Sequence, residues 1–177
     1  LLGKYLVVKH GREILSGKLV EPEAYIGEDD LACHASKGRT PRTETLYQPA
    51  GTIYVYLVYG MYHCLNIVTE KKGFPSAVLV RAVEPAEGSV TMKKRRRTQK
   101  DVSLCSGPGK LCQALGITRS MNGEMVSGDV LWIEDRRVRI RESDVVATMR
   151  VAVDYSGPCK EYPWRFYIKD SAFISRK

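Results

Sequence analysis

Carboxylate and aromatic side chains alternate along one short stretch of the sequence, VEPEAYIGEDDLACHASKGRTPR at residues 20–42. In a β-strand every second side chain points to the same face, so Glu21, Glu23 and Tyr25 would share one side. An ionised glutamate there could act as a general base toward water at neutral pH, because its unperturbed pKa is about 4.3. The stretch therefore predicts a carboxylate and an aromatic ring that face the same cavity, with His34 following an acidic turn.

Two other interpretations fit these residues. On a solvated strand face Glu21 and Glu23 would have no chemical role, and His34 would be an exposed loop histidine. Alternatively, both glutamates, Asp29, Asp30 and His34 could bind Mg²⁺ or Mn²⁺, which prefer hard oxygen ligands. The spacing matches no metal motif, so we expect neither a metal nor another cofactor.

A cation suited to orient a carboxylate stands in the otherwise apolar segment AVLVRAVEP, residues 77–85. A guanidinium buried in such a strand must be paired with an anion. Arg81 is therefore predicted to form a structural ion pair, to assist a catalytic carboxylate, or to do both.

Four tyrosines crowd into GTIYVYLVYGMYHCLN, residues 51–66, at positions 54, 56, 59 and 62. Each buried tyrosine hydroxyl needs a hydrogen-bond partner, so Val, Ile or Phe would fill a core at lower cost. Alternation along a predicted strand at 52–58 places Tyr54 and Tyr56 on one face, and YGM at 59–61 is typical of a hairpin turn. We therefore expect some of these rings to contact a ligand.

The 177 residues, 44% hydrophobic and 27% charged, are enough for one compact domain that spans residues 1–177. Strand patterns outnumber helical ones, which predicts an α+β fold with a curved, mainly antiparallel sheet flanked by helices. Strands are expected at 4–9, 18–25, 52–58, 62–69, 76–83, 129–135, 145–154 and 164–169, and helices at 86–99 and 107–117.

The net charge of +8 favours an anionic partner, with nucleic acid first. Five scattered cysteines, an odd number, indicate free thiols in a reducing compartment. The sequence has no apolar run of about 18 residues, so no membrane span is predicted. The first residues lack the succession of regions that is typical of a signal peptide. We expect a protein of the cytoplasm and nucleoid in a bacterium, or of the nucleus in a eukaryote.

Basic residues occur at three places where an anion could bind. KKRRR at 93–97 is by default a solvated helix face, with a localisation signal or phosphate contact as alternatives. SGPGKL at 106–111 lacks the Walker spacing, but the N-terminus of the following helix could bind an anion. Better-placed phosphate ligands lie beside the predicted cavity, at Lys37, Arg39 and Arg42.

Four segments together resemble the alkyladenine (3-methyladenine) DNA glycosylase family of base-excision repair. They are VEPEAYIGEDDLACHASKGRTPR, PAGTIYVYLVYGMYHCLNIV, VLVRAVEP and LCSGPGKLCQALGI, in the order expected for that family. The similarity extends over nearly the whole chain. It implies a monomeric enzyme that flips damaged purines out of duplex DNA and hydrolyses the N-glycosidic bond without a metal.

The resemblance also implies roles for individual residues. Glu23 would deprotonate the attacking water, and Arg81 would position that water. Asn66 would crowd the exocyclic amino group of normal guanine. The walls of the base pocket would be Tyr25, His34 and Tyr56.

Other implied roles concern DNA outside the pocket. Tyr59 and Met61, at the turn of a protruding hairpin, would form a wedge that fills the gap left by the flipped nucleotide. Tyr54 and Tyr62 would be packing residues. Phosphate contacts would come from Lys37, Arg39, Arg42, Gly107, Gly109 and Lys110.

Electron-rich rings favour a purine made cationic by alkylation, through a cation–π attraction of about 0.5 to 2 kcal/mol. The expected substrates are 3-methyladenine, other alkylated purines, hypoxanthine and ethenoadenine. No lysine stands at a motif position suited to a Schiff base, so strand cleavage by a lyase step is not expected. The competing functions are a non-catalytic nucleic-acid-binding module and a metal-dependent nuclease built on the acidic turn.

Overall fold

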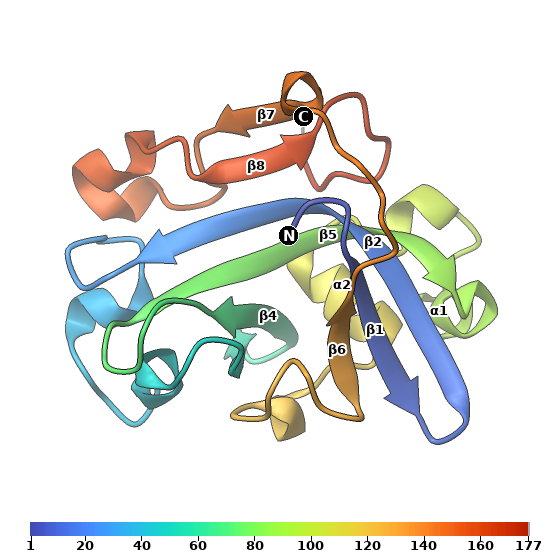
Figure 1. The fold of residues 1–177 in the computed structure, drawn as a ribbon, viewed down its shortest axis with the longest axis horizontal. Helices are drawn as coiled ribbons and strands as arrows, with labels where there is room; N and C mark the ends of the chain where they lie inside the picture. The colour runs from blue at the N-terminus through green and yellow to red at the C-terminus, as the bar shows by residue number, and fades with distance from the viewer. Residues whose placement is uncertain (177) are drawn as a thin grey trace.

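A computed structural model describes residues 1–176, which form an α+β fold built on one antiparallel sheet (Figure 1). The strands are β1 (Tyr5–His10), β2 (Glu13–Ile26), β3 (Ile53–Val58), β4 (Tyr62–Val68), β5 (Ser76–Glu87), β6 (Leu131–Glu134), β7 (Val145–Thr148) and β8 (Arg165–Ile168). The α-helices are α1 (Ser89–Arg96) and α2 (Pro108–Leu115). Short 3₁₀ helices are η1 (His34–Lys37), η2 (Glu44–Tyr47), η3 (Asp101–Ser103), η4 (Arg119–Met121), η5 (Glu142–Asp144) and η6 (Asp154–Glu161).

The sheet has the strand order β3-β4-β5-β2-β1-β6, and β8 attaches to β2 and to β7. The two longest strands, β2 and β5, run side by side through the centre of the molecule (Figure 1). Strands pair in antiparallel fashion throughout, and the sheet curls around the helices as a half-barrel. This confirms the predicted α+β class and the curved antiparallel sheet.

A β-bulge interrupts the pairing of β2 with β5. Glu21 pairs with Ala82 and Pro22 pairs with Val80, so Arg81 has no partner in the register. An unpaired bulge residue can point where regular alternation would not send it. The bulge therefore presents the Arg81 side chain to the glutamates of β2.

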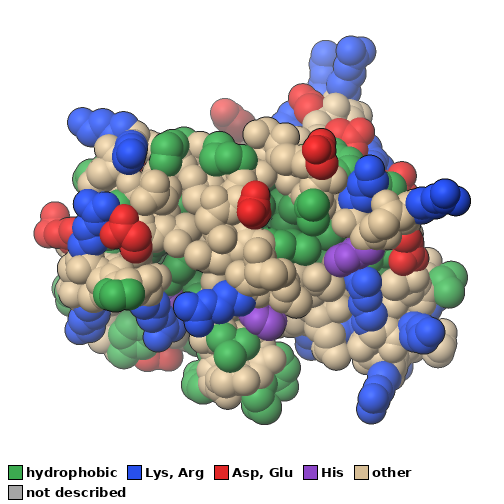
Figure 2. All heavy atoms as spheres, turned by 90° about the horizontal axis from the view of Figure 1, so that it is seen from below, with side chains coloured by type: hydrophobic (Ala, Val, Ile, Leu, Met, Phe, Trp, Pro, Cys, Tyr) green, Lys and Arg blue, Asp and Glu red, His purple; other side chains and the backbone are tan. Residues whose placement is uncertain are grey.

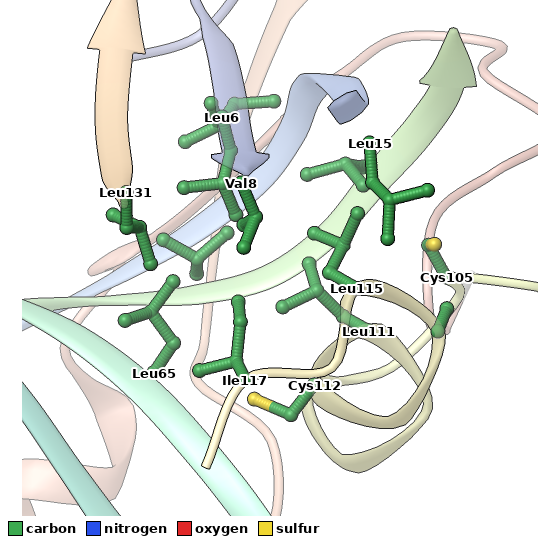
Figure 3. Packing of buried hydrophobic residues seen from close by; sticks show 14 of the residues in the cluster. Leu6, Val8, Leu15, Leu65, Cys105, Leu111, Cys112, Leu115, Ile117 and Leu131 are labelled. Carbon is green, nitrogen blue, oxygen red and sulfur yellow. The ribbon is translucent and has the colours of Figure 1, made fainter. Parts of the chain in front are cut away.

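Helix α2 covers the sheet over β4 and β5, and α1 packs against α2. The apolar residues Leu111, Cys112 and Leu115 of α2 meet Leu65 of β4 and Leu6 and Val8 of β1 in the main core (Figure 3). The helix begins at Pro108, and Gly116 ends it with a φ of 69°, a conformation that suits glycine.

Several element boundaries differ from the prediction. β2 begins at Glu13 rather than residue 18, because Gly11 and Arg12 alone form the turn between His10 and Glu13. β5 extends through Pro85 to Glu87, because that proline lies beside a register shift, where no ladder hydrogen bond is needed. Helix α1 consequently starts at Ser89 instead of 86, and β7 ends at Thr148 rather than 154.

All five cysteines are free, as predicted, and all five are buried. Burial raises the pKa of the Cys33 thiol to about 11 and that of Cys105 to about 12, so both remain protonated at neutral pH. In residues 1–176, no helix combines the length and apolar character that crossing a membrane would require.

Candidate active site

A cavity of about 500 Å³ opens between the β3–β4 hairpin, β5, the loop after β2 and the segment Val151–Val153. Its wall includes the aromatic side chains of Tyr25, His34, Tyr54, Tyr56 and Tyr155. The volume lies in the range usual for small-molecule pockets. The structure thus brings Tyr25, His34 and Tyr56 together with Asn66 and Arg81, which were predicted from distant parts of the sequence.

The Glu23 carboxylate lies behind the cavity wall and does not line the cavity, so the prediction that it faces the same cavity as Tyr25 is wrong in the structure as it stands. Its side chain is 0% exposed, and residues of the wall occupy both of its oxygens. Oε1 accepts a hydrogen bond from the Val151 backbone N–H at 2.7 Å, while Oε2 accepts one from the Tyr25 hydroxyl at 2.8 Å. Arg81 Nη1 donates to the same Oε2 at 3.2 Å. A group that enters near Tyr25 or Arg81 would therefore be separated from the carboxylate by a single layer of side chains.

Glu21 lies on the same strand face and is bound differently. Its Oε1 accepts hydrogen bonds from Arg165 Nε at 2.7 Å, from the Ser175 hydroxyl at 2.8 Å and from Arg81 Nε at 3.3 Å. Ser175 N–H donates to its other oxygen. Glu21 accepts from Arg81 Nε while Glu23 accepts from Nη1, so the two glutamates hold different nitrogens of the same guanidinium.

Three aromatic rings form one connected side of the cavity. The His34 ring meets the Tyr56 ring edge to face at 4.5 Å between centroids, and the Tyr54 and Tyr56 centroids are 5.3 Å apart. His34 Nδ1 is 2.9 Å from the Tyr54 hydroxyl oxygen. Tyr54 therefore belongs to the cavity as well as to the packing for which it was predicted.

Burial and nearby charges set the protonation of these rings. Desolvation, aided by the Arg42 guanidinium, lowers the pKa of His34 to about 4, so its imidazole is neutral at pH 7. Desolvation and the adjacent Glu23 carboxylate raise the pKa of Tyr25 above its usual range. The Tyr25 hydroxyl is therefore protonated and can donate to Glu23. Desolvation also raises the pKa of Tyr56.

Asn66 of β4 is buried and lines the cavity. Its amide nitrogen donates to the Tyr54 carbonyl oxygen at 3.2 Å across the β3–β4 pair. The hydrogen bond fixes the side chain against the sheet. Asn66 therefore presents a rigid polar group to any molecule in the cavity.

The β3–β4 hairpin ends in an exposed apolar turn. Tyr59 is 87% exposed and Met61 is 67% exposed. Tyr59 and Gly60 both have positive φ, at 51° and 69°, and the Met61 N–H bonds to the Val58 carbonyl, as in a tight hairpin turn. A tyrosine in this conformation is strained, since the left-handed region disfavours any residue with a Cβ.

The predicted phosphate ligands lie in different surroundings. Arg42 lines the cavity, and its guanidinium is 5.9 Å from the Tyr56 ring centroid. Arg39 forms two hydrogen bonds with Glu44, both of 2.7 Å, which offset its charge. Lys37 is exposed at the end of η1.

On the face shown in Figure 2, Lys and Arg side chains spread over both ends of the molecule and hydrophobic side chains gather on a projecting lobe.

The N-terminus of α2 borders a second hollow of about 370 Å³. Gly107, Gly109 and Lys110 line it together with Tyr59 and Tyr62 of the hairpin. A Cβ at Gly109 would lie 3.0 Å from the Tyr62 Cβ, so glycine permits this close approach.

The basic run 93–97 is partly structural. Arg95 Nη1 donates to the Ala114 carbonyl at 3.3 Å, and Arg96 Nε donates to the Leu104 carbonyl at 3.2 Å. These bonds tie α1 to the end of α2 and to the loop before it. At those two positions the run is therefore not simply a solvated face.

The alternative metal site does not assemble. Asp30 forms an ion pair with Arg150, and Glu21 is surrounded by arginine and serine donors. No group of three or more His, Cys, Asp or Glu side chains within residues 1–176 has the arrangement of a metal site.

Sequence reasoning missed four residues of the site: Arg150, Val151, Tyr155 and Arg165. They come from the C-terminal part of the chain, and Arg150 and Val151 lie in the predicted strand 145–154, of which only Val145–Thr148 is strand. A buried arginine in an apolar context, the signal that identified Arg81, is also present in the sequences MRVAV and WRFYI.

A family model described as methylpurine-DNA glycosylase (MPG) matches residues 1–172. The chain is 48% identical over 179 residues to a protein of Methanocella arvoryzae, covering 100% of this chain and 88% of the relative. It is 48% identical to one from Myxococcus xanthus (99% of this chain, 85% of the relative) and 44% to one from Clostridium perfringens (100% and 91%). All three relatives are provisionally named 3-methyladenine DNA glycosylase. The chain belongs to the methylpurine-DNA glycosylase family.

Proposed function

We propose that this DNA glycosylase flips damaged purines out of duplex DNA and hydrolyses their N-glycosidic bonds with a water activated by Glu23. The observation that supports this most directly is the Glu23 carboxylate, buried immediately behind an aromatic cavity and next to Arg81. The substrates are 3-methyladenine and other alkylated purines, hypoxanthine and ethenoadenine.

The cavity suits an extruded purine. The C1′ atom of a stacked nucleotide is out of reach, and extrusion costs a few kcal/mol, least for damaged or poorly paired bases. Tyr25 would lie on one side of the base, and His34 and Tyr56 on the other. Stacking on such rings contributes about 1 to 3 kcal/mol per base. Asn66 would obstruct the exocyclic amino group of guanine.

The exposed hairpin turn suits insertion into the duplex. Tyr59 and Met61 would fill the space that the extruded nucleotide leaves, as apolar wedges do in minor-groove binding proteins. Phosphates on either side would meet Lys37, Arg39, Arg42 and the N-terminus of α2 at Gly107, Gly109 and Lys110. One domain that recognises one lesion requires no second subunit, so the enzyme would act as a monomer.

The chemical step uses one water. Its oxygen forms a bond to C1′ and its proton passes to Glu23, which the water reaches when substrate binding opens the layer of side chains over the carboxylate, while the C1′–N bond breaks and the electron pair leaves with the purine. Arg81 holds both Glu23 and the water. A cationic alkylated purine is a good leaving group, whereas a neutral base such as hypoxanthine requires a proton or hydrogen bond at a ring nitrogen.

The product is an abasic site in an unbroken strand. No lysine is among the described residues that line the cavity, so no amine is placed to form a Schiff base with C1′. The enzyme is therefore proposed to be monofunctional.

The test incubates duplex DNA that contains hypoxanthine or 3-methyladenine with the wild-type protein, Glu23→Gln and the control Glu84→Gln. Glu84 lies on β5, pairs with Lys18 and is not part of the cavity wall. We expect free base and abasic sites from the wild type and the control, with or without a chelator, and a loss of at least 1000-fold in Glu23→Gln, on the order expected for an essential base.

Base release that persists in Glu23→Gln would remove Glu23 from the mechanism. Tight binding to the lesion without base release in the wild type would favour the binding module. Strand cleavage that the chelator stops would favour the nuclease.

A further inference from the structure

Arg150 is buried next to the proposed catalytic centre without lining the cavity. Its side chain and that of Asp30 are both 0% exposed. Nη1 and Nη2 each donate to one Asp30 oxygen, at 2.5 and 2.8 Å. The same two nitrogens donate to the carbonyl oxygens of Ala24, at 2.9 Å, and Cys159, at 3.1 Å. Four hydrogen bonds to three groups thus fix the guanidinium.

Two aromatic rings lie close to this guanidinium. The Arg150 Cζ atom is 4.7 Å from the Tyr25 ring centroid and 5.1 Å from that of Trp164. Tyr25 forms part of the cavity wall, whereas Arg150 and Trp164 do not. The guanidinium therefore supports the face of Tyr25 that is turned away from the cavity.

Arg150 also precedes the backbone that binds Glu23. The Val151 N–H donates to Glu23 Oε1, and the residues that follow, Ala152 and Val153, line the cavity. The Tyr25 hydroxyl donates to Glu23 Oε2. Two of the three hydrogen bonds to the Glu23 carboxylate thus come from groups that Arg150 holds in place.

Stability alone is a poor explanation for this arrangement. A buried ion pair is often no more stabilising than apolar residues of the same volume. Moreover, the Arg150 Nε has no hydrogen-bond acceptor within residues 1–176, which adds a desolvation cost. An apolar side chain could not replace Arg150 in this arrangement, because it would neither support the Tyr25 ring with a rigid plane nor anchor the backbone through hydrogen bonds.

We infer that Arg150, held by Asp30, is a positioning residue for the reaction: it fixes the Tyr25 ring against the flipped base and orients the Glu23 carboxylate through Tyr25 and Val151. The inference rests on the proposed function. Arg150 touches neither the base nor the water, so its effect should fall on the chemical step more than on DNA binding.

Two variants separate positioning from stability. Arg150→Lys keeps a charge for Asp30 but loses the planar fork and the stack. The double variant Arg150→Met with Asp30→Asn removes both charges, so no unpaired carboxylate is left buried. The matched control is Arg136→Met, because Arg136 also stacks on a tyrosine, Tyr5, at 4.4 Å and pairs with Glu87 and Glu134. None of these control residues lines the cavity.

Three quantities are measured for each protein: the melting temperature, the affinity for a duplex with an abasic-site analogue, and the single-turnover rate of hypoxanthine release at saturating enzyme. We expect both Arg150 variants to lose on the order of tenfold to 100-fold in the single-turnover rate, the range expected for a misplaced catalytic group. Their affinity should stay within about threefold of the wild type, since phosphate contacts dominate it. Arg136→Met should keep the wild-type rate.

Wild-type rates in Arg150→Lys and in the double variant would overturn the inference, as would a rate loss in Arg136→Met as large as theirs. A loss of affinity equal to the loss of rate would also overturn it, because Arg150 would then act on binding. If the wild-type protein itself releases no base from any lesion, the proposed function fails instead.

Discussion

Tyr54 of β3 has a role in the cavity through its hydroxyl group, which lies next to His34. Tyr54 is buried like a core residue, yet its hydroxyl oxygen is 2.9 Å from His34 Nδ1. A histidine ring that forms one defined hydrogen bond is held in one orientation. Tyr54 thereby fixes which nitrogen of His34 faces the space for the base.

We predict that Tyr54→Phe slows hypoxanthine release about threefold to tenfold, because the lost bond, worth about 1 kcal/mol, frees the His34 ring. Single-turnover rates measure the effect. Tyr47→Phe is the matched control, since its buried hydroxyl bonds to Glu28 outside the cavity. Equal rates in Tyr54→Phe and the wild type would show that His34 keeps its orientation without this bond.

The protonation of His34 leads to a pH-dependent stability. Its pKa is lowered from 6.5 to about 4 in the folded protein by burial and by Arg42. Between those values the unfolded chain binds a proton that the folded protein does not, so the stability falls as the pH drops from about 6.5 to 4.

We therefore predict that the free energy of unfolding of the wild type, relative to His34→Gln, decreases by on the order of 1 to 3 kcal/mol between pH 7 and pH 4.5. Urea titrations of both proteins at the two pH values measure it. A difference that is independent of pH would show that His34 titrates normally in the fold.

At the scale of elements, the β3–β4 hairpin combines a rigid base with an exposed apolar tip. β3 pairs with β4 along its full length, and its outer edge is covered in part by the Asn122 side chain, which accepts from Val55 N–H at 3.0 Å. The tip residues Tyr59 and Met61 are largely exposed and contribute little to packing. The fold therefore pairs the base of the hairpin with the sheet and leaves its tip exposed, where the proposed wedge would enter DNA.

Replacing Tyr59 with alanine should weaken base flipping and leave the fold intact. We predict at least a tenfold loss of the flipped state, because the methyl group cannot stack in the gap, and a melting temperature within a few degrees of the wild type. A fluorescent base in the duplex reports flipping, and Tyr59→Phe, which retains the ring, serves as the control. Equal flipping in Tyr59→Ala would refute the wedge.

At the scale of the whole molecule, the C-terminal segment meets β2 and β5 beside the proposed catalytic centre. Ser175 donates through its hydroxyl and its backbone N–H to Glu21, and its hydroxyl accepts from Arg81 Nε at 3.3 Å. Arg165 of β8 binds the same glutamate. The C-terminal segment therefore helps to hold Arg81, which the first half of the chain supplies.

We predict that a chain ending at Asp170 loses about 1 to 3 kcal/mol of unfolding free energy and releases base more slowly, because Glu21 keeps only its arginine partners. Denaturant titration and single-turnover rates measure both effects. Ser175→Ala tests the loss of this serine alone. Its control is Ser143→Ala, which changes an exposed serine outside this cluster. Full activity of the shortened chain would show that Arg81 needs no support from this segment.

Several features could be read from the sequence because they depend on local order. Strand alternation placed Glu23 and Tyr25 on one face, and the apolar run around Arg81 marked a buried cation. The turn at 59–61 followed from its composition, and the end of α2 followed from Gly116. Each of these depends on backbone geometry over a few residues, which neighbouring side chains largely specify.

The tertiary structure alone decided how these pieces meet. The bulge that turns Arg81 toward the glutamates depends on the register of two strands some 60 residues apart in sequence. The role of Tyr54 depends on a contact between β3 and η1, and those of Arg150 and Val151 depend on contacts between β2 and the segment after β7. Such contacts are set by long-range packing and by the need of every buried charge for a partner, and a local pattern specifies neither.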